Sequence, residues 1–211
     1  MGSLTSLTDP AALLIADASA IINLNATGCA ADILRALPNL VGVTDVVPGE
    51  LETGRSRGRR DADMLQELVS AGLVRIVTLN EAAAIHFEQL VVGPAAMTLD
   101  DGEAATIAYT AANGGIPIID ERKANRICAE RYPALRLACT TDIFMHAGVE
   151  RAIKRERLAQ GVVNALQLAR MRVLPHHVEW VIDLIGAEQA AQCTSLPQSA
   201  RRSQTKMAVQ K

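Results

Sequence analysis

The chain has 211 residues, of which 49% are hydrophobic and only 2% aromatic, and its formal net charge is −2. This length suffices for one domain with a sizeable core, which must be aliphatic and alanine-rich because aromatic residues are so few. The slightly negative charge excludes binding of nucleic acid by bulk positive charge, although it allows a local basic patch around an acidic site.

Strand and helix patterns alternate from the start of the chain. Residues 11–16 form a continuous apolar run, typical of a strand buried on both faces of a parallel sheet, and a helix pattern begins at Ser19. A short amphipathic helix over 30–37 follows. Residues 41–44 predict the second strand, which leads into a helix that carries Glu50.

A basic loop, GRSRGRR at 54–60, separates this helix from the next elements. Its arginines are either exposed to solvent without a specific role or contacts for phosphate groups. An amphipathic helix is expected over 61–71, a strand over 74–79, where apolar and polar residues alternate, and another helix over 80–92.

The chain is organised around residues 99–126. A turn signal, Asp100-Asp101-Gly102, opens a helix that Asn113-Gly114-Gly115 should end, because glycine accepts a left-handed backbone. Residues 116–119 predict a buried strand, followed by a helix from Glu121 to about Arg131 and a last short strand over 135–139. This alternation predicts a parallel sheet with helices on both faces, a three-layer α/β/α fold.

Only helical patterns follow residue 143. They predict helices over 151–172 and 175–187, packed back on the domain, and a disordered polar tail from residue 190. We therefore expect one α/β domain over 1–150, a C-terminal helical extension over 151–189, and a disordered tail over 190–211.

The cysteines and histidines show no pattern of metal ligands. The four cysteines, at 29, 128, 139 and 193, include no C-x-x-C pair, so we expect reduced, mostly buried thiols in a cytoplasmic protein. The histidines are read as solvated or packing residues. No apolar run approaches the length of a membrane span.

Four acids occupy comparable places: Asp17 and Asp120 each follow a strand, Glu50 lies in the helix after the second strand, and Glu103 starts a helix. Ligands bind at the carboxyl ends of strands in open parallel sheets, so these carboxylates predict a site for Mg²⁺ or Mn²⁺. The alternative is structural, since Asp100 with Glu103 fits a capping box and Asp120 fits a helix N-cap.

The segments around these acids resemble the PIN domain family, metal-dependent nucleases that include the VapC-type toxins of toxin–antitoxin pairs. The matching segments are LLIADASAIINL at 13–24, VVPGEL at 46–51, LDDGEAATIAYTA at 99–111, PIIDERKANRIC at 117–128 and ACTTDIFMHA at 138–147. Their order and spacing together carry the resemblance, which covers roughly residues 11–150.

The resemblance implies a metal-dependent ribonuclease with Asp17, Glu50, Glu103 and Asp120 as the metal-binding, catalytic acids. The Glu-Leu pair in the second motif favours Glu50 over Glu52. Further metal ligands implied at secondary positions are Thr140 and Asp142, and the neighbours Asp101 and Glu121 could substitute. The basic candidates for RNA phosphates are Arg55, Arg57, Arg59, Lys123 and Arg126.

The resemblance also implies partners: an RNA substrate, a small antitoxin protein and a second copy of the chain in a homodimer. Two other functions stay open at this point. One is an aspartyl phosphatase on a similar sheet, although Ser19 stands where a second aspartate is usual. The other is a PIN-like scaffold that binds RNA or protein without cleaving, although all four acids are present.

Overall fold

A computed structural model describes residues 7–201 and has the predicted three-layer α/β/α architecture. Its central sheet has four strands, all parallel, in the order β3-β2-β1-β4. The strands are β1 (Leu14–Ala16), β2 (Val41–Thr44), β3 (Val74–Val77) and β4 (Ile116–Ile118). Every residue of β1, β2 and β4 is buried, as their apolar runs predict.

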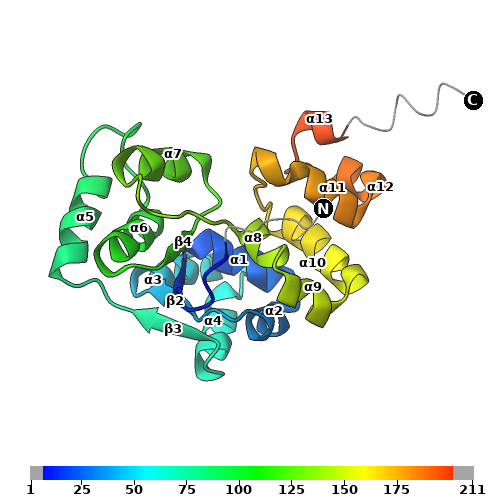
Figure 1. Cartoon of the computed structure of the whole chain (residues 1–211), viewed down its shortest axis with the longest axis horizontal. Helices are drawn as coiled ribbons and strands as arrows, with labels where there is room; N and C mark the ends of the chain where they lie inside the picture. Colours follow the sequence, from blue (N-terminus) through cyan, green and yellow to red (C-terminus); the bar gives the residue numbers. More distant parts are fainter. Residues whose placement is uncertain (1–6, 202–211) are drawn as a thin grey trace, which may run out of the picture.

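The helices of the first two thirds connect and cover these strands (Figure 1). They are α1 (Ala18–Ala26), α2 (Ala30–Ala36), α3 (Val46–Thr53), the 3₁₀ turn η1 (Arg55–Arg57), α4 (Asp61–Ser70), α5 (Glu81–Val91), α6 (Asp101–Asn113) and α7 (Arg122–Arg131). The predicted end of α6 is confirmed: Gly114 and Gly115 both have positive φ, at 79° and 108°.

The C-terminal third is helical, as predicted, but more finely divided. It comprises α8 (Thr140–Phe144), α9 (Ala147–Ile153), α10 (Arg155–Leu168), the 3₁₀ turn η2 (Pro175–His177), α11 (Val178–Ile185), α12 (Ala187–Gln192) and α13 (Gln198–Arg201). The helix expected over 151–172 is interrupted at Lys154, whose φ of 65° is incompatible with a continuous helix.

Two sequence predictions are wrong. Residues 135–139 form no strand; only Ala138 bridges to Ile118, because Cys139 already caps α8 and leaves no further residue to pair. Residues 190–201, expected to be disordered, form the end of α12 and α13. Both α12 and α13 contact α11, and buried apolar residues recur in this segment every three or four positions: Ala190, Cys193, Leu196 and Ala200. The remainder of the expected tail, 202–211, lies outside the described residues.

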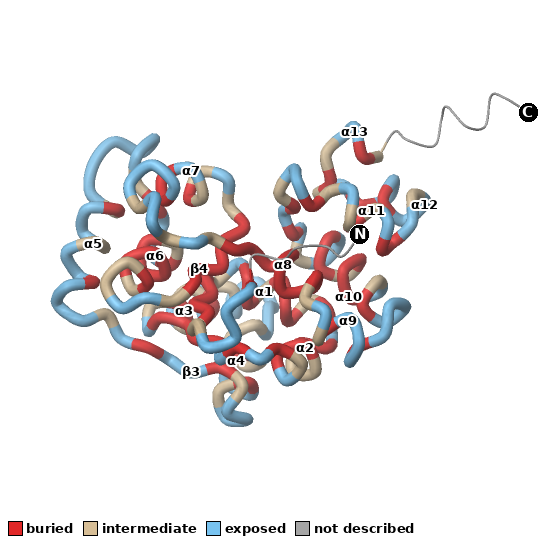
Figure 2. The backbone as a smooth tube through the Cα atoms, viewed as in Figure 1, coloured by how far each residue is buried: buried red, intermediate tan, exposed pale blue. Residues whose placement is uncertain are grey.

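One hydrophobic core joins the sheet to the C-terminal helices. It contains strand residues such as Leu14 and Ile118 together with Leu158, Val162 and Val181 of α10 and α11. A smaller cluster under α5, α6 and α7 includes Leu90, Ile107 and Ile127. Figure 2 shows the buried backbone concentrated where α1, α6, α8 and α10 surround the strands. Within residues 7–201, no helix is both long and apolar enough to cross a membrane.

Candidate active site

Asp17 and Asp120 lie at the carboxyl ends of the two adjacent strands β1 and β4. Ala16 pairs with Ile118, so the aspartates that follow them emerge at the same edge of the sheet. The chain leaves β1 toward β2 on one side and returns to β4 on the other, which makes this edge the topological switch point of the sheet. Ligands bind at such points in open α/β sheets.

Asp17 is the N-cap of α1 and is almost fully buried, with 2% of its surface exposed. Its Oδ1 accepts a hydrogen bond from the Ala20 backbone N–H at 2.7 Å, and the Ser19 hydroxyl lies 2.9 Å from each carboxylate oxygen. Burial, with the nearby charge of Asp120, raises the pKa of Asp17 to about 8 despite these donors. Ionised Asp17 is therefore energetically unfavourable without a compensating cation.

Asp120 accepts hydrogen bonds from three donor atoms and is not the N-cap of α7. Its Oδ1 accepts from the Thr140 backbone N–H at 2.8 Å, and its Oδ2 accepts from the Thr140 hydroxyl at 2.6 Å and from Asn23 Nδ2 at 2.7 Å. The N-cap of α7 is Glu121 instead, so the interpretation of Asp120 as a helix cap is wrong. Burial still outweighs the donors and raises the pKa of Asp120.

Glu50 reaches the site from α3 and is anchored by α6. Its Oε1 accepts from the Gly102 backbone N–H at 2.8 Å. A Cβ atom added to Gly102 would lie 2.2 Å from Glu50 Oε2, so only glycine permits this approach. Burial raises the pKa of Glu50, and the exposed Asp101 and Asp100 add to the rise. Its neighbour Glu52 instead pairs with Arg55 at 2.8 Å.

Glu103 lies in the first turn of α6, as predicted. Burial, with the charges of Asp100 and Glu121, raises the pKa of Glu103 to about 7, while the Asp100 backbone N–H and Lys123 act in the opposite direction. The N–H contact is one half of a capping box. The other half is missing, because the Asp100 side chain makes no capping hydrogen bond.

The carboxylates open onto a pocket of about 430 Å³. Its lining comes from α1, α3 and the start of α6: Asp17, Ala18, Ser19, Ile22, Glu50, Thr53, Asp100 and Glu103. Asp120 is not among the lining residues, but it lies within electrostatic reach of Asp17. No ion pair with another described residue neutralises any of the four predicted acids.

This arrangement suits a divalent cation. The donors are carboxylate oxygens, which Mg²⁺ and Mn²⁺ prefer, and the same oxygens repel one another when all are ionised. Burial, and to a smaller extent neighbouring acids, raises the pKa values of all four acids, so their joint ionisation is unfavourable unless a cation is bound.

The secondary acids lie elsewhere. Asp142 does not line the pocket; it accepts from the Cys139 backbone N–H at 2.9 Å and approaches His177 at 3.4 Å. Burial alone would raise its pKa, but His177 and the Cys139 N–H hold the pKa of Asp142 at about 2. Glu121 forms a short ion pair with Arg172. Thr140 serves as a donor to Asp120.

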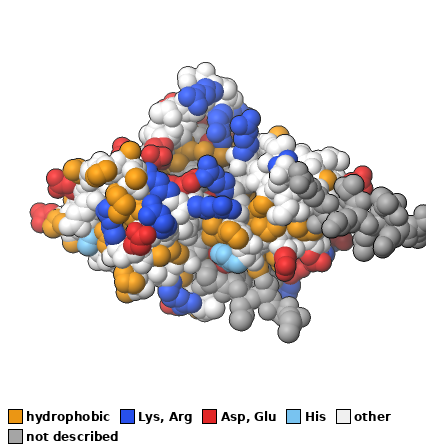
Figure 3. All heavy atoms as spheres, turned by 90° about the horizontal axis from the view of Figure 1, so that it is seen from above, with side chains coloured by type: hydrophobic (Ala, Val, Ile, Leu, Met, Phe, Trp, Pro, Cys, Tyr) orange, Lys and Arg blue, Asp and Glu red, His pale blue; other side chains and the backbone are white. Residues whose placement is uncertain are grey.

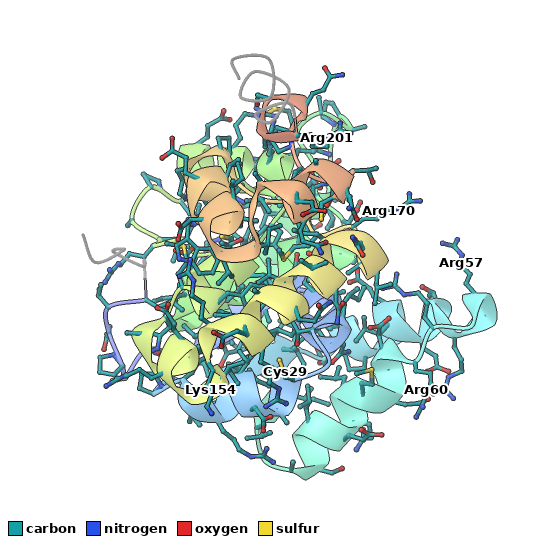
Figure 4. All side chains as sticks on the ribbon, turned by 90° about the vertical axis from the view of Figure 1, so that its right-hand side faces the viewer. Cys29, Arg57, Arg60, Lys154, Arg170 and Arg201 are labelled. Atoms are coloured by element: carbon teal, nitrogen blue, oxygen red, sulfur yellow. The ribbon has the colours of Figure 1, made fainter. Side chains whose placement is uncertain are left out.

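The predicted RNA contacts differ in availability. Arg55 is engaged by Glu52 and Asp63, Arg59 by Asp61, and Arg126 by Glu130. Arg57 makes no ion pair within residues 7–201, and Lys123 lies within electrostatic reach of Glu103. Figure 4 shows Arg57 and Arg60 projecting on the same side of the molecule as Arg170, near the end of α10.

A second depression with basic residues lies at the C-terminal helices. It has a volume of about 400 Å³ and is lined by Arg122, Arg172, Val173, Ser195, Leu196 and Pro197. In Figure 3, which views the molecule from the side of α7 and α13, Lys and Arg side chains surround a hollow near the middle of this face. Basic side chains therefore gather on this face although the net charge of the chain is negative.

Sequence reasoning missed several residues that build the site. The sequence pattern indicates only a helix cap at Asp100, yet this residue lines the pocket. Asn23 lies 97 residues from the aspartate it holds, so no local pattern could connect them. The sequence around Gly102 indicates only a turn, because the close approach of Gly102 to Glu50 depends on the packing of α3 against α6.

Comparison with known proteins agrees with the resemblance seen in the sequence. The family described as "DUF3368: PIN domain" matches residues 13–187. This match covers most of the chain, so the chain belongs to the PIN domain family, a nuclease fold whose members usually use divalent metal. Searches of the curated proteins and of the solved structures returned no match.

Proposed function

We propose that this PIN-domain protein is a Mg²⁺- or Mn²⁺-dependent ribonuclease and the toxin of a type II toxin–antitoxin pair. The observation that supports the nuclease most strongly is the convergence of four carboxylates, from four separate elements, at the β1/β4 edge of the sheet. No ion pair with a described residue balances them, and the pocket beside them is open to a ligand.

The chain's own residues would divide the work as follows. Asp17, Glu50 and Glu103 line the pocket, while Thr140 and Asn23 hold Asp120 within electrostatic reach of Asp17. A divalent ion held by these residues would activate a water molecule and stabilise the charge that develops at phosphorus. None of these roles requires a nucleophilic side chain, and the Ser19 hydroxyl is engaged with Asp17.

RNA would approach over the pocket with its phosphates near the available cations. Arg57 and Lys123 are the sequence-predicted residues most available for this contact, because neither forms an ion pair with a described residue. Arg55 and Arg126 would first have to leave their acidic partners. Phosphate contacts position a nucleic acid without reading its sequence, so these residues should affect affinity across RNAs.

The proposed nuclease activity is tested by comparing substitutions at two glutamates that lie two residues apart, one in the pocket and one outside it. Labelled single-stranded RNA, duplex RNA and single-stranded DNA are incubated with the protein in Mg²⁺, Mn²⁺ or EDTA. Glu50→Gln should lose most of the metal-dependent RNA cleavage, whereas Glu52→Gln, whose parent residue pairs with Arg55 outside the pocket, should retain it. Cleavage that persists in EDTA, or that Glu50→Gln does not reduce, would contradict the proposal.

The toxin role rests on the family resemblance and needs its own test. Induced expression of the chain in a bacterial host should arrest growth, and co-expression of a small antitoxin encoded beside it should restore growth. Glu50→Gln should abolish the arrest. The proposed homodimer is checked by light scattering at micromolar concentration, where a monomer would count against it.

A further inference from the structure

A second group of potential metal ligands lies outside the carboxylate pocket. Cys139 caps α8, Asp142 is the third residue of α8, and His177 ends η2 just before α11. All three are buried, with 1%, 4% and 4% of their surfaces exposed. Cys139 Sγ lies 3.2 Å from Asp142 Oδ2, and His177 Nε2 lies 3.4 Å from Asp142 Oδ1. One ligand atom from each residue lies within 4.8 Å of the others.

The His177 ring supplies an independent reason to expect a ligand. Its Nε2 is buried and makes no hydrogen bond to a described residue, and the nearest acidic atom, Asp142 Oδ1, lies at ion-pair distance, 3.4 Å away. An unsatisfied nitrogen in a buried site is costly and calls for an explanation. It faces a carboxylate and a thiol, which together with an imidazole make a typical transition-metal ligand set.

We propose that Cys139, Asp142 and His177 bind a zinc ion, at a site separate from the carboxylate pocket. Zinc takes thiolate, imidazole and carboxylate ligands in a tetrahedral arrangement. The fourth position falls to water or to the exposed His176, whose ring centroid lies 4.0 Å from that of His177. Binding displaces the Cys139 thiol proton to solvent, so that a thiolate meets the metal.

Such a zinc ion would join the C-terminal helices to the catalytic half of the protein. Two ligands belong to α8, whose first residue, Thr140, holds Asp120 in place. The third belongs to η2, and the segment between them includes α9 and α10. Because metal binds the folded arrangement of ligands, occupancy should stabilise the native state. This role is structural and does not depend on the proposed nuclease activity.

Cobalt substitution tests the site directly in the full-length, reduced protein. After metal removal, titration with Co²⁺ should produce sulfur-to-cobalt charge-transfer absorption that saturates at one equivalent. Zn²⁺ should abolish the absorption, whereas a large excess of Mg²⁺ should leave it unchanged, because Mg²⁺ prefers oxygen ligands. Absence of the absorption band, or its displacement by Mg²⁺, would overturn the proposal.

Matched variants assign the ligands. Cys139→Ala and His177→Gln should each remove the cobalt absorption and the rise in melting temperature with Zn²⁺. Cys128→Ala changes an equally buried thiol in the smaller core cluster and should retain both, as should Asp17→Asn. If Cys139→Ala does not fold, the cobalt titrations of His177→Gln and of the parent protein still test the proposed site. A parent-like cobalt spectrum in His177→Gln, or a lost spectrum in Cys128→Ala, would contradict the assignment.

Discussion

The position of Glu50 depends on the absence of a side chain at residue 102, and this dependence can be tested with one methyl group. In Gly102→Ala the new Cβ would lie 2.2 Å from Glu50 Oε2 and 2.8 Å from its Cδ, whereas ordinary contacts begin near 3.4 Å. The carboxylate must therefore retreat by about 1 Å, a displacement that can lower an enzymatic rate by about 10²-fold when it affects a catalytic group.

The same substitution should leave the fold intact. Alanine is favoured over glycine within helices by up to about 1 kcal/mol, and residue 102 lies in the first turn of α6. The hydrogen bond from the residue 102 N–H to Glu50 is weakened, which offsets part of that gain. We therefore expect the free energy of unfolding to change by no more than about 1 kcal/mol while metal-dependent RNA cleavage falls by about 10²-fold.

Gly49→Ala is the matched control. Gly49 precedes Glu50 in α3, and a Cβ added there would meet no atom within 4 Å. Urea denaturation and initial rates of RNA cleavage are measured for both variants at the same Mg²⁺ concentration. Parent-like cleavage in Gly102→Ala would refute the reasoning. A similar loss in Gly49→Ala would show that helix packing, not the Glu50 carboxylate, was disturbed.

Two further predictions concern stability. Thr140→Val removes the hydroxyl that donates to Asp120 at 2.6 Å and should lower the free energy of unfolding by about 1–3 kcal/mol in urea denaturation. Thr44→Val, which removes a buried hydroxyl without a partner among the described residues, should be neutral or stabilising, so equal losses in both would contradict the argument. Burial, with neighbouring acids, raises the pKa of Asp17 to about 8 and that of Glu103 to about 7, so the folded state binds more protons than the unfolded chain at neutral pH. The metal-free protein should therefore melt at a lower temperature at about pH 8.5 than at about pH 5.5, and saturating Mg²⁺ should reduce the difference; a rise with pH would contradict it.

The fold could be predicted largely from the sequence because its strands are buried on both faces. An apolar run such as residues 11–16 has one stable location, the interior of a parallel sheet, and the glycines after Asn113 end α6 where expected. The failures came from short segments. Residues 135–139 have a strand-like composition, but the cap of α8 at Cys139 limits their pairing to one bridge.

The C-terminal residues 190–201 show a different limit. The segment is polar on average, but it contains four apolar residues that are buried in the folded protein, where α12 and α13 contact α11. A pattern of alanine, cysteine and leucine at such spacing in a short segment is too weak to predict a helix from propensity alone. Packing against a neighbour supplies the stability that local sequence does not.

At the site, the sequence identifies the acids but not what positions them. The strand-end location of Asp17 and Asp120 follows from the order of the elements, and so does their meeting at one edge. The partners that orient them, such as Asn23 and Thr140, are 97 and 20 residues from Asp120 and are brought to it only by the folded chain. The cluster of Cys139, Asp142 and His177 was missed for the same reason.

The sequence presents helix capping and a functional carboxylate as alternatives, but at this site one carboxylate can serve in both roles. Asp17 caps α1 through the Ala20 N–H and lines the pocket as well. Glu50 accepts from Gly102 in the first turn of α6, and Asp120 accepts from Thr140 at the start of α8. Helix N-termini carry partial positive charge, worth about 0.3–1 kcal/mol to an acid at an exposed position. Three helices thus direct N–H groups at three carboxylates, which orients each oxygen and reduces their mutual repulsion. The pKa values of these acids are nevertheless raised, so the N–H groups do not fully offset the cost of ionising buried, neighbouring carboxylates. A divalent cation would offset the remainder of this cost, which is the electrostatic reason for it to bind.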